Sequence, residues 1–126
     1  MESKTYGLSH IAIAVRDLDR TLAFYKKVFD VEVMYQKEAF LQVTTPGSND
    51  IIVFERKNAD YGQTGGIGHF GFRLRNAEDI DEMAKRISEA GGTIIDKGEF
   101  VPGEPYIFFK DLDGYEVEIA YELLPD

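Results

Sequence analysis

Two stretches of the chain repeat one pattern of apolar and polar positions. Residues 7–15 and 66–74 each read glycine, aliphatic, small residue, histidine, and large apolar residues then alternate with small or polar ones. Alternation with a period of two predicts a strand with one buried face. Each stretch is therefore expected to form a strand that carries a histidine, His10 or His69, on the face opposite the core.

The first half of the chain continues with a helix and three strands. Asp17 is expected to cap a helix over 18–29, because apolar residues follow it at helical spacing. Three apolar, β-branched runs then predict strands, at 31–35, 40–44 and 51–55. The predicted order is βαβββ.

The second half repeats this order. Asn76 is expected to cap a helix with apolar residues at i, i+3, i+4 and i+7, which Gly91 and Gly92 end. Three further strands are predicted, at 93–95, 106–109 and 115–121. The chain is thus expected to be an α+β protein with two tandem βαβββ modules, joined by a polar, glycine-rich connector.

The two modules are expected to form one domain over residues 1–126, with module 1 at about 5–57, the connector at 58–65 and module 2 at about 66–122. Two such units predict a curved, cup-shaped mixed sheet with both helices on its outer, apolar face. Alternation along the strands then directs both histidines into the cup.

Composition narrows the possible functions. The chain has no cysteine, which excludes a disulfide framework, a thiolate metal site and a thiol nucleophile. A net charge of −9 argues against a nucleic-acid partner. Neither a signal peptide nor an apolar run long enough to span a bilayer is present, so no membrane partner and a cytoplasmic location are expected.

The repeat predicts a metal site. The chain's only two histidines occupy the same place in each copy, and superposing the last strands places Glu118 over Val53. Glu118 alternates with apolar neighbours and is expected to point into the cup with His10 and His69. Two imidazoles and one carboxylate form a set that suits Fe²⁺ or Mn²⁺ best, with Zn²⁺ or Ni²⁺ as further options. We therefore hypothesise that these three residues bind one divalent metal that polarises a small oxygenated substrate.

Each of these residues also has a plainer interpretation. A histidine away from the core is most often a surface residue, and Glu118 can be a solvated strand carboxylate, as can Glu116 on the same face. Glu55 is either an exposed charge at a strand end or a fourth ligand on a bulged strand. Arg73 can bind a substrate carboxylate or phosphonate, or form a salt bridge with a carboxylate at the rim.

Further residues are expected around the site. Ala12 and Gly71 follow the histidines into the cup, where their small size leaves space for a ligand or permits close strand packing. The connector and residues 98–105 are candidate lids. Strand alternation predicts the walls to be Phe40, Gln42, Thr44, Tyr106 and Phe108.

These motifs resemble the vicinal oxygen chelate superfamily, which includes glyoxalase I, extradiol dioxygenases, fosfomycin-resistance proteins and bleomycin-resistance proteins. The resemblance lies in residues 7–15, in the helix at 17–25 and in residues 111–118, which are similar to the family's closing motif Asp-Pro-Asp-Gly-x-x-x-Glu. It implies paired βαβββ modules, a metal held by residues matching His10, His69 and Glu118, and a homodimer whose site uses modules of one or two chains.

Departures from individual members lead to several functional alternatives. Glyoxalase I has a fourth ligand where Val53 stands here, fosfomycin enzymes have late basic residues that are absent here, and larger extradiol enzymes use a third histidine. A metal-dependent enzyme with oxygenase-type chemistry is slightly favoured by the three-ligand set. A glyoxalase-like lyase or isomerase, with Glu55 or Glu116 as proton carrier beside the ligand Glu118, is the next alternative. A fosfomycin-type transferase and a metal-free drug- or metabolite-binding protein, as in bleomycin resistance, complete the set.

Overall fold

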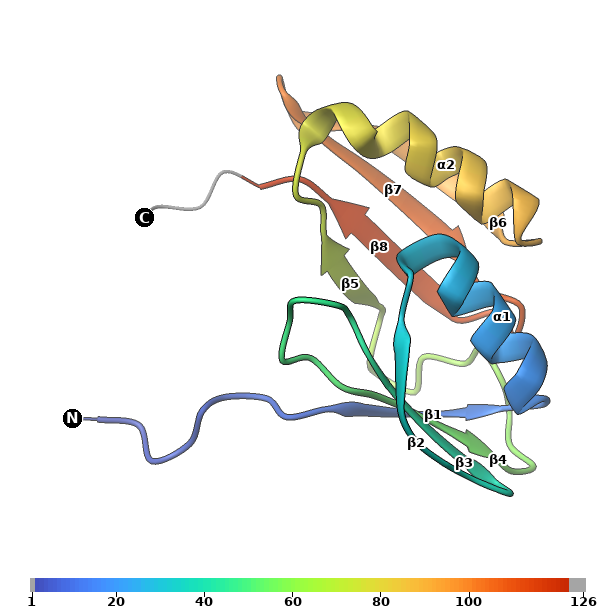
Figure 1. Cartoon of the computed structure of the whole chain (residues 1–126). Helices are drawn as coiled ribbons and strands as arrows, with labels where there is room; N and C mark the ends of the chain where they lie inside the picture. The colour runs from blue at the N-terminus through green and yellow to red at the C-terminus, as the bar shows by residue number, and fades with distance from the viewer. Residues whose placement is uncertain (1, 123–126) are drawn as a thin grey trace. The chain divides into compact units, whose positions relative to one another are not determined.

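The computed structural model describes residues 2–122 and divides the chain into two compact units, residues 1–59 and 60–126. Each unit contains one helix and one four-stranded mixed sheet (Figure 1). This confirms the predicted α+β fold of two tandem βαβββ modules. Every module contributes a sheet of its own.

Unit 1 has the strand order β1-β4-β3-β2, in which β1 and β4 run parallel and the other neighbours antiparallel. Its elements are β1 (Ile11–Val15), α1 (Leu18–Phe29), β2 (Glu32–Lys37), β3 (Phe40–Thr44) and β4 (Ile52–Arg56).

Helix α1 begins and ends where the sequence predicts. The carboxylate of Asp17 accepts a hydrogen bond of 3.0 Å from the backbone N–H of Arg20, which caps the first turn. Asp30 ends the helix in the left-handed region, with φ 57°. The buried face of the helix packs on the sheet through Tyr25, whose ring lies 4.9 Å from that of Phe54 on β4. Both the capping contacts and the buried face of α1 thus support the helix that the sequence predicts.

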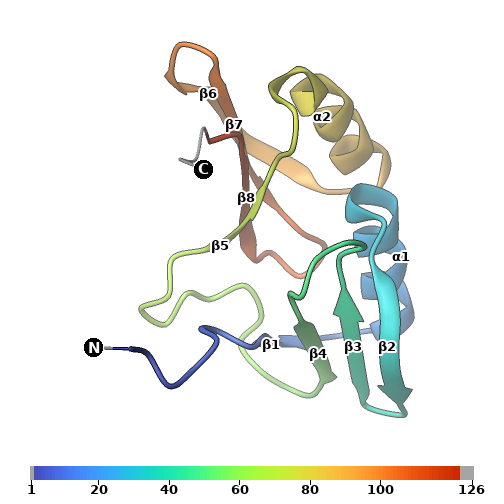
Figure 2. The ribbon, with the colours of Figure 1, turned by 60° about the vertical axis from the view of Figure 1, so that its left-hand side comes forward.

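Unit 2 repeats this architecture with the order β5-β8-β7-β6, again with one parallel pair, β5 and β8 (Figure 2). Its elements are β5 (Phe70–Arg73), a 3-10 turn (Ala77–Asp79), α2 (Ile80–Glu89), β6 (Thr93–Val101), β7 (Glu104–Lys110) and β8 (Glu116–Ala120).

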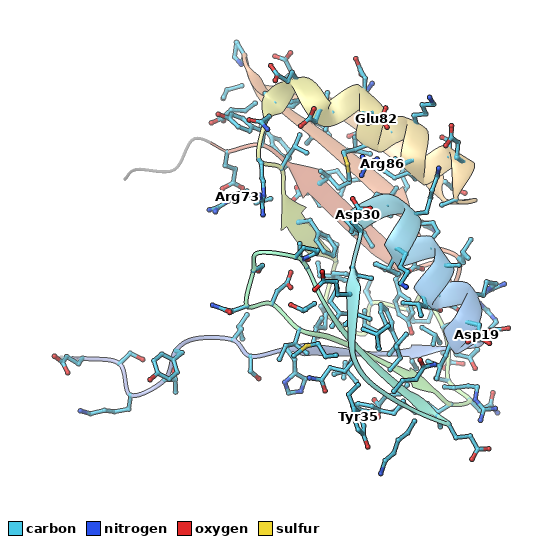
Figure 3. All side chains as sticks on the ribbon, viewed as in Figure 1. Asp19, Asp30, Tyr35, Arg73, Glu82 and Arg86 are labelled. Atoms are coloured by element: carbon cyan, nitrogen blue, oxygen red, sulfur yellow. The ribbon has the colours of Figure 1, made fainter. Side chains whose placement is uncertain are left out.

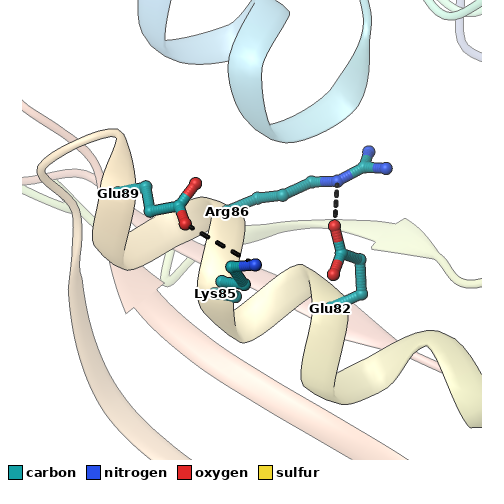
Figure 4. A network of polar contacts seen from close by, with 4 residues as sticks. All are labelled: Glu82, Lys85, Arg86 and Glu89. Carbon is teal, nitrogen blue, oxygen red and sulfur yellow. Dashed lines mark hydrogen bonds and ion pairs between the residues drawn. The ribbon is translucent and has the colours of Figure 1, made fainter.

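Helix α2 packs against β6 and β7 and has a charged outer face. Met83 and Ile87 are its buried residues. Its exposed side carries two ion pairs at i, i+4 spacing, Arg86 with Glu82 and Lys85 with Glu89 (Figure 4). Exposed pairs of this kind contribute about 0.3–0.5 kcal/mol each. The buried apolar face therefore fixes the position of α2.

The second module departs from the sequence prediction at the start of its helix and at the hairpin between β6 and β7. Asn76 precedes a 3-10 turn and not the first turn of α2, and its side chain makes no capping hydrogen bond. Residues 98–105 were expected to be a loop, but β6 and β7 extend through them to a tight hairpin. Backbone pairing within the sheet replaces the expected lid.

The connector is tied to unit 2 at Gly62. A Cβ at this position would lie 2.9 Å from the carbonyl oxygen of Asp113 and 3.0 Å from main-chain atoms of Gly114, and φ is +76°. Only glycine fits such an approach. The neighbouring turn is held by the buried carboxylate of Asp111, which accepts hydrogen bonds of 3.0 Å from the N–H groups of Asp113 and Tyr115. The closing motif thus builds the turn that leads into β8.

Both histidines precede their strands by one residue, so the predicted strands begin slightly later than expected. None of the helices in residues 2–122 combines the length and the apolar character that a membrane crossing requires.

We call the face of each sheet opposite the helix of its own unit the distal face. In unit 2 the helix-side residues Val117 and Ile119 are buried, whereas Glu116 and Glu118 alternate with them and lie on the distal face.

Candidate functional site

The distal face of unit 2 brings together His69 and two carboxylates. Phe70 pairs with Val117 and Gly71 with Glu118 across the parallel strands β5 and β8. Because side chains alternate, His69 lies beside Glu116 and Gly71 lies beside Glu118 on the same face. The sequence prediction that Glu118 shares a face with a histidine of the repeat agrees with this register.

The imidazole of His69 has defined neighbours. Its Nδ1 lies 3.7 Å from Oε2 of Glu116, and both side chains are a little over one third exposed (39% and 37%). Its ring meets the ring of Phe108 edge-on, with 5.2 Å between the centroids. A carboxylate at Nδ1 favours a proton on that nitrogen, which leaves the lone pair on Nε2. Nε2 is the nitrogen that can bind a metal.

Glu118 lies over a residue without a side chain. A Cβ on Gly71 would come within 3.2 Å of Oε1 of Glu118 and 3.4 Å of its Cβ. Gly71 therefore leaves space for the carboxylate of Glu118. On the other side of β8, Glu118 pairs with Phe108 of β7, so its carboxylate stands between a glycine and an aromatic ring.

His10 belongs to unit 1, where its Nδ1 lies 2.7 Å from Oγ of Ser9. This contact engages Nδ1, as Glu116 does for His69, and leaves Nε2 as the nitrogen without a partner among the described residues. In both repeats a neighbouring side chain thus contacts Nδ1 of the histidine.

The strand registers bear out the predicted equivalence of Val53 and Glu118. Ala12 pairs with Val53 on β1 and β4, as Gly71 pairs with Glu118 on β5 and β8. Ala12 and Gly71 each lie two residues beyond a histidine. Module 1 therefore holds a buried valine, 6% exposed, where module 2 holds a carboxylate.

The donor set His10, His69 and Glu118 suits a divalent metal chemically, since imidazole nitrogen and carboxylate oxygen both bind Mn²⁺, Fe²⁺ and Zn²⁺. Within residues 2–122, no group of three or more His, Cys, Asp or Glu side chains stands in position to hold an ion. His69 and Glu118 belong to unit 2, and His10 belongs to unit 1.

The remaining residues predicted in module 1 lie on the distal face of unit 1. Glu55 pairs with Phe40 and Ala14 in the sheet, and its carboxylate lies 3.5 Å from Nζ of Lys57. The Gln42 amide contacts the sulfur of Met34 at 3.7 Å. The Thr44 hydroxyl donates a 2.6 Å hydrogen bond to the backbone carbonyl of Asp50, so it serves the β3–β4 turn.

In module 2, Arg73 and two predicted wall residues lie on the distal face with His69. Arg73 is the last residue of β5 (Figure 3). Its side chain makes no hydrogen bond or ion pair with any described residue, so the alternative of a salt bridge at the rim is not seen among residues 2–122. Tyr106 and Phe108 alternate on β7, with 5.6 Å between their ring centroids.

Sequence reasoning missed Phe100 and Asp96 on β6. Phe100 stacks on Tyr106 with 4.1 Å between centroids and an interplanar angle of 16°. The Tyr106 hydroxyl donates a 3.0 Å hydrogen bond to Oδ2 of Asp96, and this bond raises the pKa of Tyr106 above its usual value. The first of two register shifts in β6, between Ile94 and Asp96, puts Asp96 opposite Phe108 on the face of Tyr106, and Phe100 follows on that face by ordinary alternation. Alternation along the sequence gives no signal of such shifts.

Comparisons with known proteins identify the family of the chain and several relatives. A model of the Glyoxalase/Bleomycin resistance protein/Dioxygenase superfamily matches residues 7–119. The fosfomycin resistance protein FosX of Listeria monocytogenes is 31% identical over 123 residues, which are 90% of this chain and 87% of that protein. A lactoylglutathione lyase of Arabidopsis thaliana is 27% identical over 87% of this chain and 42% of its own length.

Solved structures give the same result. A crystal structure of FosX from Listeria monocytogenes matches with a TM-score of 0.79 and 28% identity, covering 95% of this chain and 96% of that chain. Another structure of that protein, described as complexed with Mn(II) and a sulfate ion, also has a TM-score of 0.79 and 28% identity, covering 95% of this chain and 93% of that one.

Proposed function

Because the chain belongs to the Glyoxalase/Bleomycin resistance protein/Dioxygenase superfamily, we propose that it is an enzyme dependent on one divalent metal ion. His10, His69 and Glu118 would hold the ion, and the substrate is a small molecule with neighbouring oxygen atoms. The observation that carries the proposal is that His69 and Glu118 lie on the same distal face. Gly71, which has no side chain, leaves space there for the carboxylate of Glu118. The Mn(II) in FosX supports Mn²⁺ or Fe²⁺, with Zn²⁺ or Ni²⁺ as further candidates.

The metal would act as a Lewis acid that draws electron density from the bound oxygens. The residues of this chain perform the remaining tasks. Glu116 and Ser9 keep the imidazoles of His69 and His10 turned so that Nε2 is presented. Arg73, which has no described partner, binds an anionic group of the substrate. Phe40, Gln42, Thr44, Tyr106 and Phe108 remain the proposed substrate-contacting walls.

The relatives reported above are a fosfomycin resistance protein and a lactoylglutathione lyase, and the name of the second supports a non-redox reaction. We propose that reaction type ahead of the oxygenase type that the three-ligand set slightly favoured. Within it, a fosfomycin-type hydrolase or transferase has the support of the greater sequence identity and coverage. The lyase is the second candidate, because Glu55 lies two residues beyond Val53 on the same face of β4 and is able to move a proton.

A homodimer in the cytoplasm is the proposed state of the protein. The proposed ligand set draws on both modules, which one chain or two chains can supply. Sedimentation of the full chain at several concentrations measures this state. A monomer at all concentrations would contradict the dimer and leave the ligand set as it stands.

The test of the proposed function begins with metal binding. Protein freed of metal is titrated with Mn²⁺, Fe²⁺, Zn²⁺ and Ni²⁺, with His69→Ala and Glu118→Gln as variants and Val53→Ala as the matched control. We expect the wild type and the control to bind one metal ion per chain, and we expect the two variants to lose this binding. A chain that takes up none of these ions would overturn the proposal and leave a metal-free binding protein.

Reaction type is then read from a substrate panel on the metal-loaded chain. Fosfomycin with and without glutathione separates a transferase from a hydrolase, and the hemithioacetal of methylglyoxal and glutathione reports a lyase. Oxygen uptake with catechols reports an oxygenase. Turnover without oxygen uptake is expected, and oxygen consumption tied to a catechol would replace the non-redox proposal with the oxygenase.

A further inference from the structure

The distal face of unit 2 carries an aromatic row that starts at the proposed metal ligand. The ring of His69 meets that of Phe108 at 5.2 Å, Phe108 meets Tyr106 at 5.6 Å, and Tyr106 stacks on Phe100 at 4.1 Å. Phe108 also pairs with Glu118 across β7 and β8. We call Phe108, Tyr106 and Phe100 the aromatic row.

The far end of the aromatic row is held in place by polar and backbone contacts. Tyr106 pairs with Gly98 on β6, where a Cβ would lie 3.0 Å from the Tyr106 hydroxyl oxygen, so the tyrosine ring lies across a residue without a side chain. Its hydroxyl donates to Asp96 at 3.0 Å. Phe100 lies two residues beyond Gly98 and so on the same face of β6, where the pairing with β7 shifts register between Glu99 and Val101.

The stack nevertheless remains accessible. Phe100 is 54% exposed, although a residue of this size normally gains most from burial. Its other neighbour in the row is Phe108 at 6.4 Å. An aromatic pair that is oriented by a carboxylate and a glycine, yet half open, offers a flat surface to a ligand.

From this geometry we propose, on the basis of the proposed function, that the substrate carries an aryl or similarly flat apolar group beside its metal-binding oxygens, and that this group lies against the aromatic row. The oxygens reach the metal at His69 and Glu118, and the flat group extends along β7 toward Phe100. A substrate of this class differs from a small, wholly polar one in the area it can cover on these rings.

The experiment compares two ligands with the same chelating head. Phenylpyruvate and pyruvate both present a carboxylate and a neighbouring carbonyl, and only phenylpyruvate carries a ring. Their dissociation constants are measured by calorimetry on the Mn²⁺-loaded full chain. Phenylpyruvate is expected to bind on the order of tenfold more tightly, as ring burial and stacking predict.

The matched variants are Phe100→Ala and Val101→Ala, which remove neighbouring side chains of similar exposure, 54% and 50%. Phe100→Ala should bring the two dissociation constants together and leave that of pyruvate unchanged. Val101→Ala should keep the preference for the ring. Equal constants in the wild type, or an unchanged preference in Phe100→Ala, would overturn the inference.

Two further readouts separate this inference from the proposed function. If the chain takes up no metal, the proposed function fails, and ring signals of Phe100 and Tyr106 in NMR spectra still report binding. Shifts with phenylpyruvate and none with pyruvate would support the aromatic row as a ligand surface, and the absence of shifts would refute it. Sedimentation of Phe100→Ala tests the rival occupant: dissociation of an oligomer would make the row a contact between copies and overturn the inference.

Discussion

Nδ1 of His69 faces the carboxylate of Glu116 at 3.7 Å, and Nδ1 of His10 faces the hydroxyl of Ser9 at 2.7 Å. Two repeats with different neighbours thus engage the same imidazole nitrogen. A metal ligand benefits from this arrangement, because the partner at one nitrogen fixes the ring orientation. At His69 the partner is a carboxylate, which only accepts, and it therefore also favours the tautomer that leaves Nε2 free. Glu116 is therefore better explained as a positioning residue for His69 than as a freely moving proton carrier.

Glu116→Gln is expected to change the tautomer of His69 in the metal-free protein. Loss of the carboxylate weakens the preference for a proton on Nδ1, so the share of the tautomer with a free Nε2 should fall. Nitrogen chemical shifts of the imidazole in NMR spectra measure this directly. Mn²⁺ affinity should fall about 10- to 100-fold.

The matched control for Glu116 is Glu122→Gln, which removes an exposed carboxylate from the residues just after β8. It should leave both the tautomer and the affinity unchanged. Glu116→Asp should restore part of the tautomer preference, since a carboxylate remains. An unaltered His69 spectrum in Glu116→Gln would exclude the positioning role.

Gly71→Ala tests the space beneath Glu118. The new Cβ would lie 3.2 Å from Oε1 of Glu118, which is tighter than ordinary contact, so the carboxylate must turn away. The backbone of Gly71 has no positive φ, and folding should be preserved. We expect a loss of metal affinity of at least about tenfold, because ligand geometry tolerates little displacement.

The control for Gly71→Ala lies in the other module, where Ala12 already carries a Cβ opposite Val53. Ala12→Gly removes that Cβ next to a residue that binds nothing, and should not alter the metal affinity. Calorimetric titration with Mn²⁺ compares both variants with the wild type. Full affinity in Gly71→Ala would mean that the carboxylate finds an equally good position.

The sequence was sufficient for the repeat and for the face of β8 on which Glu118 lies. Helix α1 and strand β3 have the predicted bounds, because Asp17 caps the helix and turn residues flank the strand. The equivalence of Val53 and Glu118 followed from superposing two modules, and the two registers agree with it. Local pattern and repeat symmetry therefore carry most of the fold.

The sequence was insufficient where the backbone departs from regular alternation. The register shift between Ile94 and Asp96 puts Asp96, and with it Gly98 and Phe100 at a period of two, on the face of Tyr106, and the linear pattern does not reveal such a shift. Likewise, Asn76 has the chemistry of a cap, yet the 3-10 turn that follows does not use its side chain. Side-chain positions on the distal face depend on pairing between strands, which the linear pattern leaves open.

The hydrogen bond between Tyr106 and Asp96 predicts a pH effect. This bond raises the pKa of Tyr106, since the neutral phenol donates to the carboxylate and the phenolate would be repelled by it. A group whose pKa is raised by folding stabilises the folded state below its ordinary pKa, about 10, and loses that contribution as pH rises through the raised value.

Asp96→Asn should therefore lower the pKa of Tyr106 toward its ordinary value. Alkaline titration of the phenol absorbance, compared with that of Tyr106→Phe to identify the signal, measures the change. The fall in stability above about pH 10 should also become less steep in Asp96→Asn. An identical titration in wild type and variant would show that the hydrogen bond does not persist in solution.

Gly62→Ala is expected to destabilise unit 2 more than an otherwise comparable substitution. Both Gly62 and Gly103 have positive φ, +76° and +87°, but a Cβ at Gly62 meets the main chain at Asp113 and Gly114, whereas one at Gly103 meets nothing within 4 Å. Gly103→Ala should thus cost only the conformational strain, about 1–2 kcal/mol of unfolding free energy. Gly62→Ala adds about 1–3 kcal/mol for the steric conflict, because backbone atoms cannot move aside as a flexible side chain would. Urea unfolding of the two variants measures the difference, and equal losses would show that the connector does not hold its close approach to the turn before β8.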